Sequence, residues 1–469
     1  MKIKGFIAII LASLMLLCGC AADPSGVPDN TPENTPENTQ EASHHEHTGY
    51  VIAAPAPHEY AADPNSIVSE DGAVDHEKYN SMYEEWVKQL NARREEAKSA
   101  PDLRAFTEGL LTELMTQAED NNLVFSPANI FVALAMLAET AEGETRREIL
   151  SLLGAGDMES LRKAASALIK AEPVDDGVTK CTVANSLWLN DRYSFVTETL
   201  ERLADIYDAS SFWGDPCDGD FVQALRDWLN DNTGGLLKDA VDSVELEPST
   251  VLAIASTIYF KAAWENEYNK NATSPMTFHA PTGDIECDFM HKSVHGGYFR
   301  GEGFSALGDA LKGSAGTMWY LLPDDGVSVE EMLKGSGMEF IFSDKSGANS
   351  SVIVNVSAPK IDVSADTDLV DALKSMGMRS CFVPEAAEFD PITTDAGELF
   401  VTEIKHAARV KTDEDGVEAA AFTLIKVYGN GAILPQEIVD FVLDRPFAFV
   451  ITGISGAPLF VGIVNTPAE

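Results

Sequence analysis

Two kinds of hydrophobic pattern alternate along the chain and predict a mixture of helices and strands. Apolar residues recur at helical spacing, opposite charged faces, over residues 130–137 and 144–152. Short apolar runs rich in β-branched residues predict buried strands; they cover residues 182–189, 252–260, 317–322, 351–357 and 447–454. Because the helices come mostly early and the strands mostly late, the chain is predicted to be an α+β protein and not a regular βαβ repeat.

The chain begins with the pattern of an export signal. Lys2 and Lys4 precede an apolar run at residues 6–17, which is too short to span a bilayer comfortably. The run leads into Leu-Cys-Gly-Cys, ending at Cys20, which resembles the lipobox of bacterial lipoproteins. We therefore predict a lipoprotein signal peptide over residues 1–20 and a lipid on Cys20, with an ordinary signal peptide or a buried apolar segment as the alternative. The mature protein would be anchored to the outer face of a bacterial membrane, or secreted, and would not span the membrane.

A polar stretch follows this signal. Residues 21–77 contain no Lys or Arg and repeat the tetrapeptide Thr-Pro-Glu-Asn, so an extended tether is expected. A histidine cluster in it is interpreted as solvated and not as a metal site; its members are His44, His45 and His47. Residues 79–98 have amphipathic helical spacing, so residues 21–98 are predicted to be a tether with a helical segment near its end.

The remaining residues, 99–469, contain no linker, repeat or low-complexity break and are expected to form one large domain. The formal net charge of the chain is −42, which argues against nucleic acid or anionic polysaccharide as a partner. Four cysteines lie outside the signal, widely scattered and without a CxxC pair; they are Cys181, Cys217, Cys287 and Cys381. Metal binding is therefore not expected, and mostly buried thiols are favoured, although their disulfide state stays open.

The sequence lacks the common catalytic motifs. There is no G-x-S-x-G elbow, Walker A sequence, H-E-x-x-H pair or dinucleotide fingerprint, so neither a metal nor a cofactor is expected. Any of four histidines in the folded part could serve a nucleophilic serine, but no motif places one beside such a serine; they are His279, His291, His295 and His406. A hydrolase is therefore disfavoured.

The most informative segment follows the acidic triplet at residues 413–415. Gly416 leads into Val-Glu-Ala-Ala-Ala-Phe-Thr-Leu-Ile-Lys-Val-Tyr, and a Gly-Asn-Gly patch comes next. Side chains on a strand alternate between faces, and one face would carry small or β-branched residues at Val417, Ala419, Ala421 and Thr423. The other face would carry Glu418, Ala420 and Phe422. This pattern is typical of a strand with one buried face, and on alternation alone a constitutive strand with a hairpin loop remains the alternative.

This segment resembles the reactive-loop hinge of the serpin family, in which acidic residues and Gly precede Thr, Glu, a run of Ala and Thr. Other stretches resemble serpin landmarks in the family's order; they are residues 122–127, 184–189, 228–235, 256–264, 358–361, 373–378, 445–447 and 458–465. The resemblance covers essentially residues 100–469. It implies a serpin domain at residues 99–469, with three β-sheets surrounded by about nine helices and an exposed reactive-centre loop.

The resemblance implies a suicide inhibitor of serine, or also cysteine, proteases and not an enzyme. Serpins are cut in the loop by the target protease, form an acyl-enzyme, and insert the freed hinge into the central sheet as a new strand. The loop-hinge residues carried over from the family are Gly416, Val417, Glu418, Ala419, Ala420, Ala421 and Thr423. Val417 stands where Thr is usual and is still uncharged and strand-favouring, so inhibition is expected to survive.

Five further residues fall where serpins control the opening of the sheet. Ser126, Asn129, Ser256 and His406 fall at the shutter, a polar cluster beneath the parting strands, and Trp264 falls at the breach, where the loop first enters. Asn129 stands where Ser is common and Ser256 where Asn is common, so a rewired polar network is expected.

The position of the cleaved bond stays open. Counting fourteen residues on from Gly416 places it between Asn430 and Gly431, whereas counting back from Pro446 gives a position near Leu434. Because Asn before the cut suits few proteases, the alternatives are Val427, Tyr428, Ile433 and Leu434. These residues favour elastase-, subtilisin- or chymotrypsin-like targets over trypsin-like ones.

Three other functions remain as alternatives to protease inhibition. A non-inhibitory serpin acting as a binding protein usually has bulky or charged inward hinge residues, which this chain lacks. A cell-surface hydrolase or a surface adhesin would not need the loop. A monomer is expected, no basic helix for an activating polyanion is evident, and the target protease is not identified by the sequence.

Overall fold

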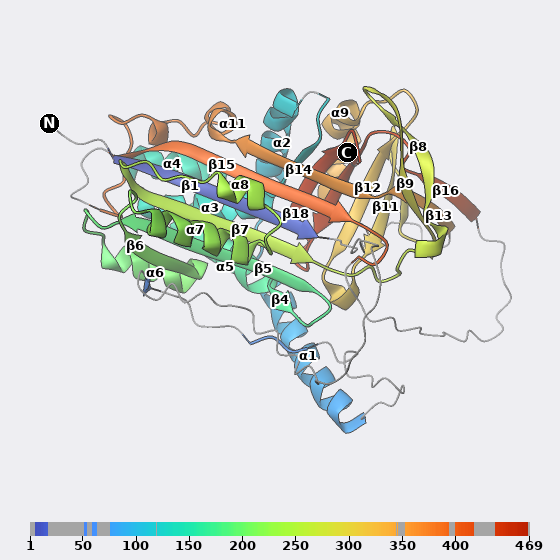
Figure 1. Cartoon of the computed structure of the whole chain (residues 1–469), viewed down its shortest axis with the longest axis horizontal. Helices are drawn as coiled ribbons and strands as arrows, with labels where there is room; N and C mark the ends of the chain where they lie inside the picture. The colour runs from blue at the N-terminus through green and yellow to red at the C-terminus, as the bar shows by residue number, and fades with distance from the viewer. Residues whose placement is uncertain are drawn as a thin grey trace, which may run out of the picture.

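The computed structural model describes residues 5–16, 51–53, 59–62, 76–118, 120–343, 345, 352–393, 399–416 and 437–467. They form an α+β structure with three sheets, as predicted (Figure 1). The main sheet runs in the order β14 (Ile361–Asp368), β15 (Leu399–Thr412), β1 (Gly5–Leu16), β7 (Thr250–Lys261), β5 (Lys180–Asn190), β6 (Ala209–Gly214) and β2 (Val51–Ala53), with β4 (Val174–Asp175) paired to β5.

Two smaller sheets complete the β-structure. The second sheet has the order β10 (Tyr298–Arg300), β11 (Phe304–Ala310), β12 (Thr317–Pro323), β17 (Phe447–Thr452), β18 (Pro458–Val464) and β3 (Leu123–Phe125). The third has the order β16 (Glu437–Val442), β13 (Val352–Pro359), β9 (Gly283–His295) and β8 (Ser274–Ala280). The five strands predicted from apolar runs correspond to β5, β7, β12, β13 and β17, and these predictions are confirmed.

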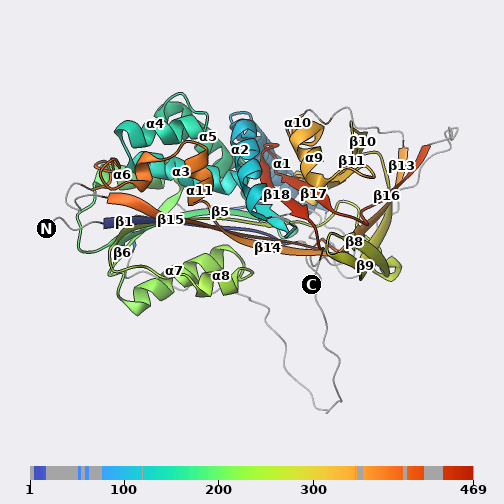
Figure 2. The ribbon, with the colours of Figure 1, turned by 90° about the horizontal axis from the view of Figure 1, so that it is seen from above.

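The helices lie on both faces of the main sheet. One face, which we call the rear, is covered by α2 (Arg104–Ala118), α3 (Pro127–Thr140), α4 (Gly143–Leu152), α5 (Met158–Ala171), α6 (Thr197–Tyr207) and α11 (Val370–Ser375) (Figure 2). The opposite, front face carries α7 (Gly219–Asn232) and α8 (Lys238–Asp242). Two short helices, α9 (Val329–Met332) and α10 (Met338–Phe342), follow β12. The helices predicted at residues 130–137 and 144–152 are parts of α3 and α4.

The helix at the centre of the rear layer begins at a strong local signal. Ser126 caps α3, because its hydroxyl accepts a hydrogen bond from the Asn129 amide at 3.2 Å, and Pro127 takes the first helical position. Every residue of α3 is buried, so this helix packs on all sides against the sheet and the other rear helices.

The N-terminal part of the chain contacts the domain in three places, one of them through β2, which pairs with β6 at the edge of the main sheet. Residues 5–16 form β1 inside the main sheet, and the segment with helical spacing near residue 90 is α1 (His76–Ala97). Arg93 of α1 donates hydrogen bonds to the carbonyls of Ala171 and Glu172 at 2.8 and 3.0 Å, which fixes the C-terminal half of α1 next to α5. Within the described residues, no helix has both the length and the apolar character needed to cross a membrane.

The four cysteines outside the first twenty residues are unpaired in the structure. Cys181 and Cys381 are buried, as favoured, and burial raises the pKa of each thiol well above its ordinary value. Cys287 is half-buried and Cys217 is exposed, so the expectation of buried thiols holds for two of the four.

Candidate functional site

The main sheet contains a slot for one strand between β7 and β15. Both strands run in the same direction, and β1 lies between them, parallel to each along its length. Leu11, for example, pairs with Ser256 on one side and with His406 on the other. Adjacent strands lie about 4.8 Å apart, so β7 and β15 are separated by about twice that distance. The sheet therefore accommodates a complete strand at this position.

One end of the slot is closed by the turn that follows β15. In this turn Gly416 has φ +71°, and a Cβ there would lie 2.5 Å from the backbone nitrogen of Trp264. Only glycine tolerates both the backbone conformation and the close approach. A chain that turns back from Thr412 at this glycine would run antiparallel to β15 and to β7. Gly416 thus has the geometry of a hinge at the end of the slot.

Trp264, predicted for this region, is completely buried and holds the turn by its indole nitrogen, which donates to the carbonyl of Asp413 at 2.8 Å. The Tyr268 amide donates to the Glu414 carbonyl at 3.0 Å. Lys292 lies over both aromatic rings and forms a buried ion pair with Asp309 at 2.7 Å. Burial lowers the pKa of Lys292 and raises that of Asp309, while the pairing opposes both shifts. The hinge therefore rests on a rigid aromatic platform.

The three acidic residues of the turn have different partners. Glu414 pairs with Lys360 at 3.0 Å and accepts from the Thr273 hydroxyl at 2.6 Å, and Asp415 forms an ion pair with Lys270. Asp413 is buried; one carboxylate oxygen accepts from the Asp415 amide, and the other has no hydrogen-bond partner among the described residues. Burial, with the two neighbouring carboxylates, raises the pKa of Asp413 to about 6.

The structure brings together the four residues predicted at the shutter, all of them buried on the rear side of the slot. The Asn129 side-chain amide donates to the Ser256 hydroxyl at 2.8 Å, and this hydroxyl donates to Asn185 at 2.7 Å. Asn185 on β5 continues the chain to the carbonyl of Tyr207 at 2.7 Å. This chain of hydrogen bonds reaches one strand further than the four predicted residues, to Asn185, whose side chain was not assigned a role from the sequence.

His406 lies on the β15 side of the slot. Its Nε2 accepts a hydrogen bond from the Ser126 amide at 3.0 Å, so the proton of the neutral ring is on Nδ1. Burial lowers the pKa of His406 to about 3, which keeps the ring neutral at physiological pH. Neither His406 Nδ1 nor Asn129 Oδ1 has a hydrogen-bond partner among the described residues.

The predicted reactive loop lies outside the described residues. This applies to the hinge residues after Gly416, which are Val417, Glu418, Ala419, Ala420, Ala421 and Thr423. It applies also to the proposed reactive bond at Asn430 and Gly431 and to its alternatives Val427, Tyr428, Ile433 and Leu434, as well as to the lipidation site Cys20.

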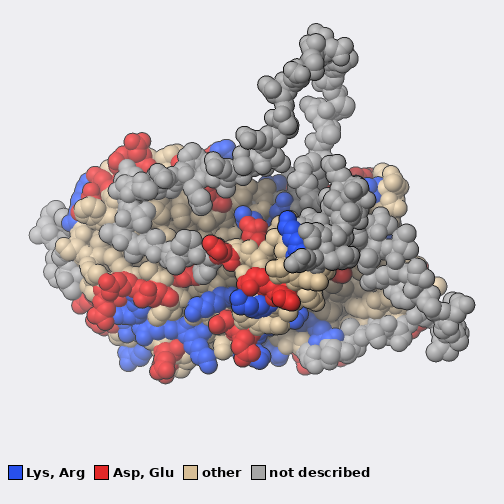
Figure 3. All heavy atoms as spheres, turned by 90° about the horizontal axis from the view of Figure 1, so that it is seen from below, with Lys and Arg blue, Asp and Glu red and all other residues tan. Residues whose placement is uncertain are grey.

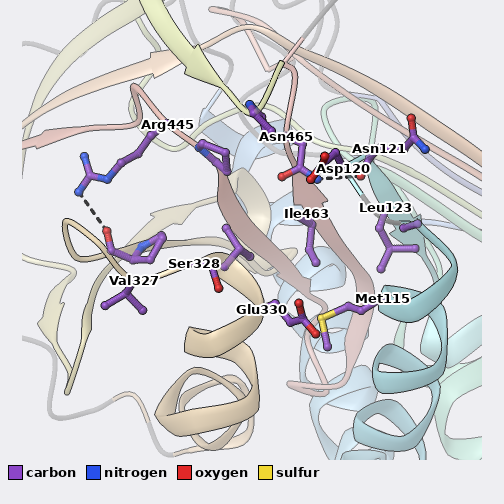
Figure 4. A pocket seen from close by; sticks show the side chains of 15 residues that line it. Met115, Asp120, Asn121, Leu123, Val327, Ser328, Glu330, Arg445, Ile463 and Asn465 are labelled. Carbon is purple, nitrogen blue, oxygen red and sulfur yellow. Dashed lines mark hydrogen bonds between the residues drawn. The ribbon is translucent and has the colours of Figure 1, made fainter. Parts of the chain in front are cut away.

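A separate hollow of about 250 Å³ lies between α2, α9 and β18 (Figure 4). Met115 and Ile463 line it with apolar side chains, and Glu330 and Arg445 also line it. Arg445 is held by the carbonyl of Pro323 at 3.0 Å. This hollow is remote from the hinge along the chain and shares no residue with it.

Basic side chains interrupt the acidic surface. On the face drawn in Figure 3, Lys and Arg side chains lie next to Asp and Glu. The large negative net charge is therefore not spread evenly, and this face is mixed in sign.

Comparison with known proteins agrees with this geometry. The chain is 29% identical over 376 residues to an uncharacterized serpin-like protein of Thermococcus kodakarensis. This match covers 78% of this chain and 85% of that protein. It is 28% identical over 368 residues to Serpin-ZX of Arabidopsis thaliana, covering 76% of this chain and 94% of the relative. Among solved structures, the native state of the thermophilic serpin tengpin is similar with a TM-score of 0.66 and 27% identity, over 77% of this chain and 92% of that chain.

Arabidopsis AtSerpin1 in its native stressed conformation is similar with a TM-score of 0.67 and 25% identity, over 79% and 98% of the two chains. The sequence profile of the family described as Serpin (serine protease inhibitor) matches residues 102–467. That match takes in the slot, the hinge and the polar cluster beneath them, and the family consists in general of protease inhibitors and not of enzymes. The chain belongs to the serpin family.

Proposed function

We propose that this protein is a one-shot inhibitor of serine proteases that traps its target by inserting its own cleaved loop between β7 and β15. The observation that carries the proposal is the slot itself. It accepts a strand of twelve residues between two parallel strands, and the glycine hinge stands at one end of it. A loop that continues from this hinge is connected directly to the position it would occupy.

The chemistry of the trap needs no catalytic group from this chain. The protease serine oxygen attacks the carbonyl carbon of the residue before the cut, the C–N bond breaks, and the new amino terminus leaves with a proton. The ester that remains joins the protease to the loop. Insertion then forms two new hydrogen-bond ladders and buries one face of the loop, which supplies the driving force against the entropy of ordering it.

The alternation of the hinge sequence fits this insertion. Val417, Ala419, Ala421 and Thr423 share one face and are uncharged. A bulky or charged residue on the face that becomes buried would have to be desolvated without a partner, which is costly. For the cleaved bond we favour Asn430–Gly431, with Val427, Tyr428, Ile433 and Leu434 as alternatives, and elastase-, subtilisin- or chymotrypsin-like targets.

The position of the protein in the cell belongs to the same proposal. Signal cleavage before Cys20 would remove residues 5–16, and so would empty the slot for the loop. A lipid on Cys20 would hold the domain at the outer face of a bacterial membrane through residues 21–50.

The test is to mix the chain lacking residues 1–19 with a panel of serine and cysteine proteases. We expect a covalent complex that survives denaturant, and sequencing of the released C-terminal peptide would identify the cleaved bond. Ala421→Arg should convert the inhibitor into a substrate, because a guanidinium cannot be buried unpaired in the sheet. Ala420→Arg is the matched control, since this residue alternates to the other face. Loop cleavage with no complex and no gain in heat resistance would contradict the proposal.

A second candidate is a binding protein that uses the hollow of Figure 4. It is lined by apolar side chains together with an arginine and a carboxylate, as many small-molecule sites are. Human thyroxine-binding globulin, a structural neighbour at 21% identity and a TM-score of 0.68, was solved in complex with its ligand. Thyroxine is therefore the first probe. A melting temperature that is unchanged at saturating thyroxine would contradict the binding-protein function and leave protease inhibition as the proposed function.

A further inference from the structure

The front of the slot is roofed by one turn of the chain, residues 233–237 between α7 and α8. We call this turn the cover. It is attached to the β7 side by apolar packing, since Leu237 of the cover is buried in a cluster with Trp188 of β5 and Tyr259 of β7. Gly234 approaches Tyr259 so closely that a Cβ there would lie 2.8 Å from the tyrosine ring. The cover is therefore fixed firmly to one wall of the slot.

The opposite wall holds the cover in a different way. Arg409 of β15 donates from Nη1 to the carbonyl oxygen of Leu236 at 3.3 Å. The same guanidinium binds Asp362 of β14 with two hydrogen bonds of 2.7 and 2.8 Å, which orient it and raise its pKa. Around this contact the cover and the β14–β15 pair are separated by a hollow of about 490 Å³. Ala407 of β15 also packs against the cluster that contains Leu237, and Arg409 spans the part of the gap that this packing leaves open.

The strand register shows that this contact crosses the slot. Arg409 pairs with Leu14 of β1, and Leu14 pairs on its other side with Tyr259. The cover contacts Tyr259 through Gly234 and Arg409 through the carbonyl of Leu236. The cover therefore bridges from wall to wall directly over an occupied position of the slot.

We propose that Arg409 is a clasp that holds the cover over a strand in the slot and so stabilises the filled state. With the slot empty, β15 would move about one strand spacing, 4.8 Å, toward β7. That displacement exceeds what a hydrogen bond tolerates, so the contact as seen belongs to the expanded sheet. The role of the clasp in retaining a trapped protease rests on the proposed function, whereas its effect on the cover does not.

The experiment uses the full chain, in which residues 5–16 fill the slot, and needs no protease. Hydrogen exchange of residues 233–243 is measured in Arg409→Met, in Arg409→Lys and in Lys411→Met. Lys411 lies two residues along the same face and also pairs with Asp362, at 3.5 Å, but no hydrogen bond or ion pair joins it to the cover within the described residues. Losing one hydrogen bond from a charged donor should speed exchange of the cover about tenfold in Arg409→Met, with little change in Lys411→Met.

A double-mutant cycle tests the dependence on the filled slot. Leu11→Pro removes a backbone donor from the middle of β1 and should empty the slot. Arg409→Met should then have little additional effect on the cover. Equal exchange in Arg409→Met and wild type, equal effects of Arg409→Met and Lys411→Met, or an unchanged effect of Arg409→Met in the Leu11→Pro background would each overturn the clasp. Failure to trap any protease would instead overturn the proposed function and leave these results intact.

Discussion

The two walls of the slot differ in how they are packed. On the β7 side, β7 is buried at every position except the last, because the rear helices cover one face and α7 and α8 cover the other. On the β15 side, buried and partly exposed positions alternate, and the front face of β14 and β15 carries Asp362, Arg409 and Lys411. Ala407 joins β15 to the front core, but the rest of this wall is packed less completely than β7. A sheet packed more extensively on one side than on the other separates most easily at the boundary between them. The slot lies at that boundary.

The strand that occupies the slot should have a stronger effect on trapping than either wall. The full chain should be cleaved as a substrate by a protease that the chain lacking residues 1–19 traps, because β1 already pairs with both walls. The effect should be close to all-or-none on the covalent band in a denaturing gel. Leu11→Pro in the full chain is the control and should restore trapping. Equal complex formation by the full and shortened chains would contradict this prediction.

The front core of the β7 side should dominate stability. Trp188 is 1% exposed and stacks on Phe212 with ring centroids 4.2 Å apart, so Trp188→Ala should lower the free energy of unfolding by about 3–5 kcal/mol. Lys405→Ala on the front of β15 should change it by less than about 0.5 kcal/mol, because the partner of Lys405 is half-exposed Glu403. Urea unfolding measures both, and similar losses would remove the difference between the walls.

The hinge that joins the walls should be sensitive to a single methyl group. Gly416→Ala should cost about 1–3 kcal/mol, because it strains a left-handed residue and pushes the turn off Trp264. Gly456→Ala is the matched control: φ is +76° there, but a Cβ would meet nothing within 4 Å. A larger loss in Gly456→Ala than in Gly416→Ala would show that the contact with Trp264 contributes nothing.

The smallest expected effect is a pH dependence at the same turn. Asp413 has a pKa of about 6 in the folded protein against 3.8 for the free group, so the folded state binds its proton more tightly. Its contribution to stability is fully present below pH 3.8 and is lost as the pH rises through 6. Asp413→Asn should abolish this part of the decrease in the unfolding midpoint with rising pH, whereas Asp415→Asn should retain it. An unchanged slope in Asp413→Asn would assign the dependence to another group.

Most of the fold could be predicted because its signals are local. The alternation and apolar runs of β5 and β7, the Ser-Pro start of α3 and the Gly416 hinge are each readable within a few residues. The apolar run near the start of the chain was also visible, but it satisfies the requirements of a leader and of a buried strand equally well. Composition alone cannot decide between these two environments.

The contacts that the sequence did not reveal join residues far apart. Arg409 and Leu236 are separated by 173 residues. The acceptor is a backbone carbonyl, and because every residue has one, the residue type gives no indication of this contact. Asn185 could have been suspected, since a polar residue stands there at a buried position of a strand, yet its partner Ser256 is 71 residues away. The reactive bond stayed open for another reason, because loop length can be counted from either end with different results.

The attachments of α1 and β2 determine how a captured protease would be presented. Arg93 fixes α1 beside the segment that leads into β5, and β5 starts at Lys180, opposite Lys261 near the hinge. In the proposed anchored form, however, the tether first meets the body at β2, which pairs with β6 at the opposite end of the main sheet. A protease carried along the length of β15 would travel about 40 Å to the opposite pole. In the proposed anchored form, each capture would thus bring the protease to the end of the sheet at which residues 51–53 attach.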